Sequence, residues 1–249
     1  MTRHVMLNNI AHKDLRVNTR YGAEFGDSVG TVMTVPTEFA DVQREYPIFF
    51  RKDPVTGEFM SIALLGFSKD ENLFLDERGW NASYVPGVIA RGPFLIGFQE
   101  RQEGGELQKE AVIHVDLDSP RISSSADEGE AVFLPQGGNS RYLNRVVDIL
   151  NGIRVGLEAS KSMFAAFTEA DLIEPLKLEI KINSEQQYNL LGLHTINQQK
   201  LANLSAEALH KLHRTGFLQG AFLVVSSLNN VQRLIELKGR RQHQAATAS

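Results

Sequence analysis

The chain has 249 residues, of which 42% are hydrophobic and 22% are charged, and 26 Lys and Arg against 30 Asp and Glu give a formal net charge of −4. These proportions are typical of a folded globular protein and exclude a disordered chain. The weakly acidic balance argues against a nucleic-acid-binding protein, which carries a basic face. The chain contains no cysteine, so disulfide bonds, thiolate zinc sites and a cysteine nucleophile are excluded.

The N-terminal residues 1–29 are polar, and we expect them to form an extended arm. Basic side chains outnumber acidic ones over residues 1–21, so contact with an acidic partner is an alternative to a solvated edge. No apolar run there reaches the roughly 7–15 residues of a signal peptide, and no window approaches the roughly 20 apolar residues of a membrane-spanning helix. We therefore expect a cytoplasmic protein without a membrane span.

Short apolar runs that are typical of strands follow from Gly30. The expected strands are Thr31–Val35, Tyr46–Phe50, Phe59–Phe67, Asn72–Asp76, Phe94–Phe98 and Ala111–Leu117. The second and third of these form a hairpin, because Asp53–Gly57 between them has Pro and Gly in turn positions. A polar loop through residues 104–105 joins the last two, and a short helix spans Thr37–Arg44.

The second half of the chain has helical as well as strand patterns. Residues 122–138 are rich in Ser, Gly and acidic residues, and they predict a surface connection. Apolar residues then recur at steps of three and four over Arg141–Leu157, which predicts an amphipathic helix that Met163–Phe167 extends or follows. Gly152 and Gly156 in this helix indicate close packing or a bend.

The remaining elements are two strands, a helix, a core strand and a last helix. In chain order they are Lys177–Ile182, Tyr188–Ile196, Ala206–Thr215 with Ser205 as its N-cap, Phe217–Val225, and a helix from Ser226 or Ser227 to Lys238. A strand-rich first part and a helix-containing second part predict an α+β fold with a mainly antiparallel sheet. We expect one domain over residues 30–238 and a disordered tail over residues 239–249.

One pattern suggests a metal centre. His114 and Asp116 are two residues apart on an expected strand, so they share a face. With His194 they would complete the facial triad of a non-haem Fe(II) oxygenase, and Arg214 would hold a 2-oxoacid. The alternative is a strand end at which Asp116 or Asp118 caps the turn at Ser119-Pro120, and this is the interpretation we favour.

A second pattern is the glycine-containing stretch that precedes the long helix. Gly137–Ser140 offers backbone N–H groups for a phosphate, but the spacing of the known phosphate-binding loops is absent. We therefore expect a plain loop in which Ser140 or Asn139 caps the helix.

A binding surface is the most specific functional expectation. Trp80, Tyr84, Arg91 and Phe94 cluster in a Gly- and Pro-rich segment. Loops carry function more often than the elements they connect, and Trp, Tyr and Arg are common binding anchors. We expect these four residues to contact a ligand or partner, with a lid over the core as the alternative.

Short motifs along nearly the whole chain carry a family resemblance. They are Tyr46–Phe50, Ala63–Phe67, Glu71–Phe74, Gly79-Trp80, Tyr84–Pro86, Arg91–Phe94, Asp118–Pro120, Leu190–Leu193, Lys200-Leu201 with Leu204, and Leu212 with Gly216–Leu218. In this order and spacing, from about Thr34 to Leu237, the chain resembles the SapC family of bacterial proteins.

The resemblance implies a biological context but no catalytic mechanism. The family takes its name from a locus associated with a bacterial surface layer. The resemblance also implies relatives whose genes lie beside genes for halogenase-like proteins, cupin-like proteins and TonB-dependent receptors. It supplies no catalytic residue and no cofactor. We expect a non-catalytic accessory protein that recognises a peptide or protein partner, such as the product of a neighbouring halogenase-like or TonB-receptor gene. An Fe(II)- and 2-oxoacid-dependent oxygenase and a surface-layer component are the alternatives.

Overall fold

The computed structural model describes residues 3–103, 106–123, 125, 127–182 and 186–248. The chain packs into two compact units. Unit 1 is formed by Met1–Asp27 and Gly87–Arg154, and unit 2 by Ser28–Pro86 and Val155–Ser249. Each unit therefore combines two separate segments of the chain. This packing differs from the expected arm, single domain and tail, because the first 27 residues belong to a unit with regular structure.

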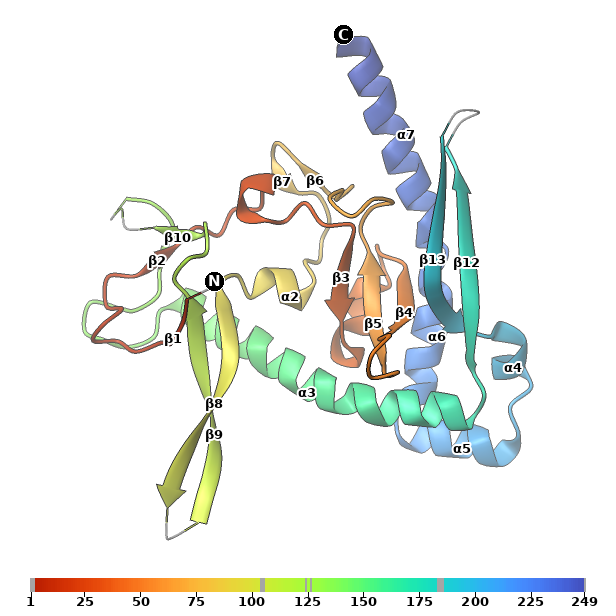
Figure 1. Ribbon diagram of the computed structural model, residues 1–249, viewed down its shortest axis with the longest axis horizontal. Coiled ribbons are helices and arrows are strands. Elements are labelled where there is room, and N and C mark those ends of the chain that lie inside the picture. Colours follow the sequence, from red (N-terminus) through yellow and green to blue (C-terminus); the bar gives the residue numbers. More distant parts are fainter. Residues whose placement is uncertain (1–2, 104–105, 124, 126, 183–185, 249) are drawn as a thin grey trace. The chain divides into compact units, whose positions relative to one another are not determined.

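Unit 1 contains two small antiparallel sheets. The larger sheet has the order β1 (His4–Met6), β9 (Glu106–Asp116) and β8 (Phe94–Glu103), and the smaller has the order β10 (Ile122–Ser123), β2 (Arg16–Val17) and β11 (Glu130–Ala131). Figure 1 shows β8 and β9 as a long hairpin. Its expected connection through residues 104–105 lies outside the described residues. The N-terminal segment thus contributes a strand to each sheet instead of forming an arm.

The core of unit 1 lies between these sheets and the first half of helix α3 (Arg141–Glu169). Phe94 pairs with Val115 in the register of β8 and β9, and both are fully buried. Helix α3 begins where expected, because the Ser140 hydroxyl accepts a hydrogen bond from the backbone N–H of Leu143 at 3.1 Å. Of the two candidates Ser140 and Asn139, Ser140 is therefore the N-cap. Unit 1 also contains the short helices η1 (Ala23–Phe25) and α2 (Gly87–Ala90).

Unit 2 is built around one five-stranded antiparallel sheet (Figure 1). Its order is β12 (Ile173–Lys181), β13 (Gln187–Ile196), β4 (Ile48–Lys52), β5 (Phe59–Leu64) and β3 (Thr31–Thr34). The expected hairpin is confirmed, since Lys52 pairs with Phe59 and the Asp53 side chain accepts hydrogen bonds within the turn. The turn between β12 and β13 includes residues 183–185, which lie outside the described residues.

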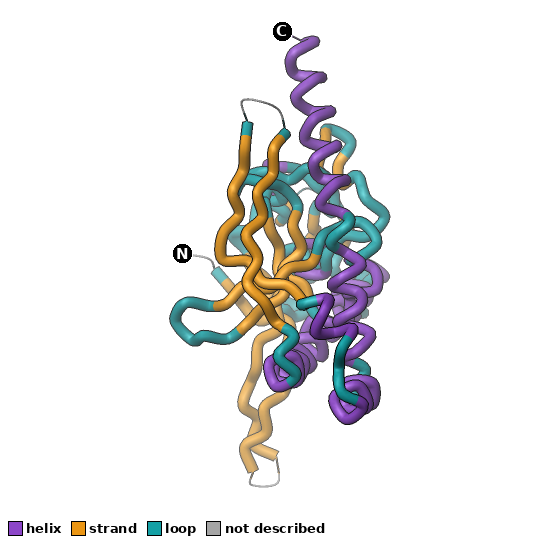
Figure 2. Tube along the Cα trace, turned by 90° about the vertical axis from the view of Figure 1, so that its right-hand side faces the viewer, coloured by secondary structure: helices purple, strands orange, loops and turns teal. Residues whose placement is uncertain are grey.

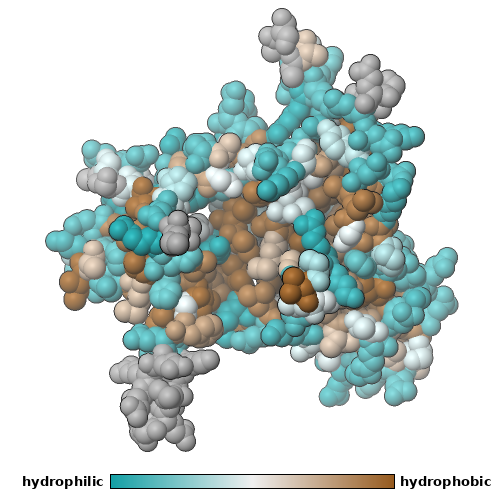
Figure 3. Space-filling model, viewed as in Figure 1, coloured by the Kyte–Doolittle hydropathy of each residue, from teal (hydrophilic) through white to brown (hydrophobic). Residues whose placement is uncertain are grey.

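Helices complete unit 2. They are η2 (Pro36–Glu38), α1 (Phe39–Val42), the part of α3 from Val155 onward, α4 (Gln198–Ala202), α5 (Ala206–Arg214), α6 (Phe217–Ser227) and α7 (Asn230–Ala248). Figures 1 and 2 place α6 and α7 on one face of the sheet. The surfaces of α5 and of the free end of α7 are mostly hydrophilic (Figure 3). The core of this unit includes Phe50, whose ring centroid lies 5.0 Å from that of Phe164 on α3.

The α+β class is confirmed, and three local expectations are wrong. Residues Phe217–Val225 form helix α6 and no strand. An apolar run of this length has no distinguishing period, and a buried helix fits it as well as a buried strand. Ser227 ends α6 instead of capping the last helix, and its hydroxyl accepts a hydrogen bond from the N–H of Ile48 at 2.9 Å. In the expected strand Asn72–Asp76, only Leu75 and Asp76 pair, as β6, with β7 (Gly79–Trp80).

The C-terminal residues also differ from the expected tail. Helix α7 continues past Gly239 to Ala248. Lys238 bonds to Glu71 at 2.5 Å, and Arg241 donates to the carbonyl oxygen of Leu75. These contacts fix the middle of α7 and explain why the helix does not end at Gly239. Among the described residues, no helix has the length and apolar character needed to cross a membrane.

Candidate functional site

The four residues expected to form one surface fall in different units. Trp80 and Tyr84 belong to unit 2, whereas Arg91 and Phe94 belong to unit 1. Phe94 has no exposed surface and is a core residue. The Arg91 guanidinium donates a hydrogen bond to the carbonyl oxygen of Phe94, and burial lowers the Arg91 pKa. Of the four, the structure links Trp80 with Tyr84.

The link between these two residues is the hydroxyl of Tyr46. Tyr46 ends the turn after α1, and its side chain is fully buried. Its hydroxyl accepts a hydrogen bond from the indole N–H of Trp80 at 2.8 Å and donates one to the carbonyl oxygen of Tyr84 at 2.5 Å. One buried group therefore fixes the two ends of the segment 80–84, which we call the aromatic loop. Trp80 and Tyr84 themselves remain half-buried.

Glu45, the neighbour of Tyr46, holds the middle of the aromatic loop. One carboxylate oxygen accepts hydrogen bonds from the N–H and hydroxyl of Ser83, at 2.7 and 2.9 Å, and from the N–H of Tyr84 at 3.3 Å. The other oxygen lies 3.2 Å from the guanidinium of Arg233 on α7. Burial alone would raise the Glu45 pKa, but the bonds from Ser83 and Tyr84 and the charge of Arg233 lower it below its ordinary value.

A second carboxylate, that of Glu38, fixes the side chain of Tyr84. It accepts hydrogen bonds from the Tyr84 hydroxyl at 2.6 Å, from the Thr34 hydroxyl at 3.0 Å and from the N–H of Val35 at 3.2 Å. Burial and the bond to Glu38 raise the pKa of Tyr84 far above its ordinary value. Both carboxylates thus serve as hydrogen-bond acceptors for the loop. This arrangement supports a rigid contact surface more than proton transfer.

Comparison with known protein families covers nearly the whole chain, including the aromatic loop. The family model described as SapC matches residues 7–234. The chain belongs to the SapC family. No curated protein and no solved structure matches it significantly.

The SapC family assignment agrees with the positions of the motifs that suggested it. Tyr46 and Pro47 lead into β4, and Ala63–Phe67 covers the last two residues of β5 and the three that follow it. Glu71 accepts a hydrogen bond from the N–H of Phe67 at 2.9 Å, so two of the motifs contact each other directly. These motifs in unit 2 therefore build the sheet and the support of the aromatic loop.

The metal-site alternative for this SapC protein finds no support. His114 and Asp116 lie on β9 in unit 1, and His194 lies on β13 in unit 2. Asp116 accepts a hydrogen bond from the N–H of Asp118 at 3.1 Å, as expected for a turn cap. The His194 ring packs at 5.1 Å against Phe59. Within the residues that the structure describes, no group of three or more His, Cys, Asp or Glu side chains is placed to hold a metal ion.

The sequence analysis identified Trp80 and Tyr84 but missed the residues that support them. Glu38, Glu45 and Tyr46 come from the helical segment and the turn before β4, more than thirty residues away in the chain. Their local pattern is that of an ordinary amphipathic turn, and long-range hydrogen bonds leave no periodic signal in a single sequence.

Proposed function

We propose that this SapC family member is a non-catalytic accessory protein that binds a peptide or protein partner through the aromatic loop. The supporting observation is the pair of half-buried aromatic residues, Trp80 and Tyr84, fixed by hydrogen bonds to Tyr46, Glu38 and Glu45. Aromatic side chains contribute most to binding when they lie in a preorganised, well-packed setting. The loop meets that condition before any partner arrives.

The surroundings of the loop fit a protein-binding surface. Exposed polar residues flank the two aromatic side chains: Asp76, Glu77, Arg78, Asn81 and Ser83. An apolar or aromatic centre with a polar rim is the usual composition of protein interfaces. Phe94 is excluded from this surface by its burial, and Arg91 is left out because it belongs to unit 1.

The first partners to test are those that the family resemblance suggests, the products of neighbouring halogenase-like and TonB-receptor genes. We also propose a cytoplasmic location, which cell fractionation tests. No observation favours the oxygenase or the surface-layer component as a second candidate function.

The test compares binding of a purified partner to three variants of the full chain. Trp80→Ala removes the main contact, and Asn81→Arg places a bulky charge on the exposed rim without touching the buried hydrogen bonds. We expect both variants to raise the dissociation constant at least about tenfold, as for substitutions at interface hot spots. The control is Phe222→Ala, which truncates a 53% exposed aromatic residue on α6 of the same unit.

Isothermal titration calorimetry gives the dissociation constants, and thermal unfolding shows whether each variant is folded. If Trp80→Ala unfolds, Asn81→Arg alone decides the question. Undiminished binding by a folded Asn81→Arg variant, or equal losses for Asn81→Arg and Phe222→Ala, would contradict the proposal.

A further inference from the structure

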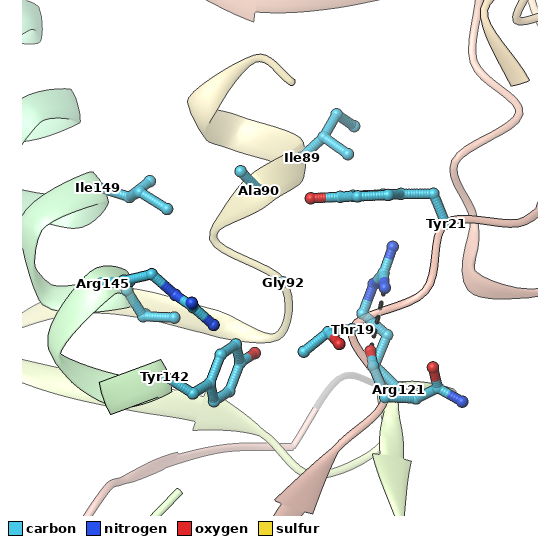
Figure 4. A pocket seen from close by; sticks show the side chains of 11 residues that line it. Thr19, Tyr21, Ile89, Ala90, Gly92, Arg121, Tyr142, Arg145 and Ile149 are labelled. Carbon is cyan, nitrogen blue, oxygen red and sulfur yellow. Dashed lines mark hydrogen bonds between the residues drawn. The ribbon is translucent and has the colours of Figure 1, made fainter. Parts of the chain in front are cut away.

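Unit 1 contains a cavity of its own, of about 210 Å³, that the aromatic loop does not touch (Figure 4). Its walls come from the segment 18–21, from α2 and the turn after it, from Arg121 and from the first half of α3. All of these belong to unit 1. The volume is below the roughly 300–1,000 Å³ typical of sites for drug-sized ligands. The cavity therefore suits a small ligand or a single side chain.

One wall is a single face of helix α3. Tyr142, Arg145, Val146 and Ile149 line the cavity, and their spacing of three, four and seven residues places them on one side of the helix. Ile89 and Ala90 of α2 form an apolar part of the lining. The cavity thus joins a polar end to an apolar wall.

Gly92 closes the cavity near Tyr142. Its φ of +58° lies in the left-handed region, and a Cβ there would lie 3.5 Å from the Tyr142 hydroxyl. The turn after α2 therefore brings bare backbone close to this hydroxyl. A side chain at this position would be strained and would fill the space beside Tyr142.

The first of two cations at the cavity, Arg121, is fully engaged. Its guanidinium binds both carboxylate oxygens of Asp27, at 2.6 and 2.7 Å, and the carbonyl oxygens of Asn18 and Arg20. Its charge lies 5.5 Å from the centre of the Tyr21 ring. The side chains of Arg121 and Asp27 are 6% and 5% exposed. This ion pair is a fixed part of the wall, and the negative charge of Asp27 offsets the positive charge of Arg121.

The second cation, Arg145, is different. The residue is exposed, and its guanidinium makes no hydrogen bond and no ion pair among the described residues, although its charge acts on Tyr21 and Tyr142. None of the described residues that line the cavity is acidic. The carboxylate of Glu130 acts on Tyr142 but does not line the cavity. Because Asp27 offsets the charge of Arg121, the charge of Arg145 leaves the lining itself net positive.

Hydroxyl donors accompany this charge. The Tyr142 side chain is 8% exposed, and its hydroxyl has no hydrogen-bond partner within the described part of the chain. In Figure 4 the Arg145 guanidinium and the Tyr142 hydroxyl point toward the same space, and the hydroxyl end of Tyr21 points into it from the other side. Burial raises the pKa of both tyrosines, so both hydroxyls are protonated at neutral pH, and the Tyr142 hydroxyl is the donor on which the inference depends.

We infer that this cavity binds a carboxylate carried on a short apolar group, with the carboxylate on Arg145 and Tyr142 and the apolar group against Ile89 and Ala90. A single uncompensated guanidinium with a neutral hydroxyl donor matches one negative charge. The apolar wall excludes a ligand that is polar throughout. Either a free small acid or the carboxyl terminus of a peptide presents this chemistry. The inference concerns unit 1 and does not depend on the aromatic loop.

The test uses hexanoate as the probe, with hexylamine and hexanol as matched ligands of the same chain length. Isothermal titration calorimetry on the full chain measures each dissociation constant. We expect hexanoate to bind and the amine and alcohol to bind at least about tenfold more weakly, because only the carboxylate pairs with Arg145. Equal binding of all three ligands, or no binding of hexanoate, would overturn the inference.

Variants on helix α3 locate the binding. Arg145→Gln should weaken hexanoate binding at least about tenfold, and Tyr142→Phe by a smaller factor. Arg141→Gln is the control, because Arg141 is exposed on the same helix and does not line the cavity. The Arg145 guanidinium has no hydrogen bond or ion pair among the described residues, so its variant remains informative if Tyr142→Phe is unstable. Identical affinities for Arg145→Gln and Arg141→Gln would place the ligand elsewhere.

A second arm separates the two sources of the carboxylate. The peptide acetyl-Gly-Leu is compared with its C-terminal amide, on the wild-type chain and on Arg145→Gln. Binding of the free acid but not the amide, lost in Arg145→Gln, identifies a peptide terminus as a ligand. Binding of hexanoate without the peptide restricts the site to small acids, and failure of both ligands refutes the inference.

Discussion

The hydroxyl of Tyr46 has the most defined role of any single group near the aromatic loop. It is buried, it accepts the indole N–H of Trp80, and it donates to the carbonyl oxygen of Tyr84. Without the Tyr46 hydroxyl, the half-buried Trp80 N–H and Tyr84 carbonyl would each lose a hydrogen-bond partner. Replacing Tyr46 with Phe removes this one oxygen atom and keeps the ring, so it measures what the hydroxyl contributes to stability.

We predict that Tyr46→Phe lowers the free energy of unfolding by about 1–3 kcal/mol. The matched control is Tyr142→Phe, because the Tyr142 hydroxyl has no hydrogen-bond partner among the described residues. That change should stay within about 0.5 kcal/mol. Urea denaturation measures the free energy of unfolding of both variants. Equal changes would show that the hydrogen bonds of the Tyr46 hydroxyl do not stabilise the folded protein.

Single residues also show how far sequence reasoning places side chains together. Trp80 and Tyr84 were predicted from residue type and from their Gly- and Pro-rich surroundings, and the structure connects them through Tyr46. Phe94 was grouped with them by sequence proximity, yet it pairs with Val115 in the core of unit 1. Sequence distance alone does not reveal that the chain crosses from unit 2 to unit 1 between Pro86 and Gly87.

At the scale of elements, periodic patterns were predicted well and aperiodic ones were not. The alternation in β12 and β13 and the three- and four-residue steps in α3 gave the correct type. Residues 217–225 have no such period, and the helix that they form is fixed by tertiary burial of Ala221 and Val224. The anchoring of α7 by Glu71 and Leu75 is likewise long-range and left no local signal.

The two glycines of α3 predict opposite mutational effects. A Cβ on Gly156 would lie 2.5 Å from the Val35 side chain, whereas one on Gly152 would meet nothing within 4 Å. We predict that Gly156→Ala destabilises the protein by about 1–3 kcal/mol through overpacking. Gly152→Ala should stabilise it by up to about 1 kcal/mol through helix propensity. Thermal unfolding measures both, and changes of the same sign would contradict the packing at Gly156.

The aromatic loop should respond to acid through Glu45. Its folded pKa is lowered from the ordinary value of 4.5, so its contribution to stability is present above that value and is lost as the pH falls through the lowered pKa. Trp80 is the only tryptophan in the chain, and its fluorescence reports the loop. We predict an emission change below about pH 4.5 that is absent in Glu45→Gln. An identical acid transition in Glu45→Gln would show that other groups control the loop.

For the molecule as a whole, the two units divide the proposed functions between them. Unit 2 carries the aromatic loop, and unit 1 carries the cavity with Arg145. The α+β class and the SapC assignment were accessible from the sequence, because they depend on patterns spread over the whole chain. The division into two units was not, because each unit joins segments that are far apart in the sequence.

The most direct test of the proposed partner binding places a probe on Trp80. Since Trp80 is the single tryptophan, 5-fluorotryptophan incorporated into this chain gives one ¹⁹F resonance, even with a tryptophan-containing partner. We predict that saturation with the partner shifts this resonance and protects the side chain from an added paramagnetic quencher. A partner that binds at saturation and leaves both the shift and the quenching of Trp80 unchanged would contradict binding through the aromatic loop.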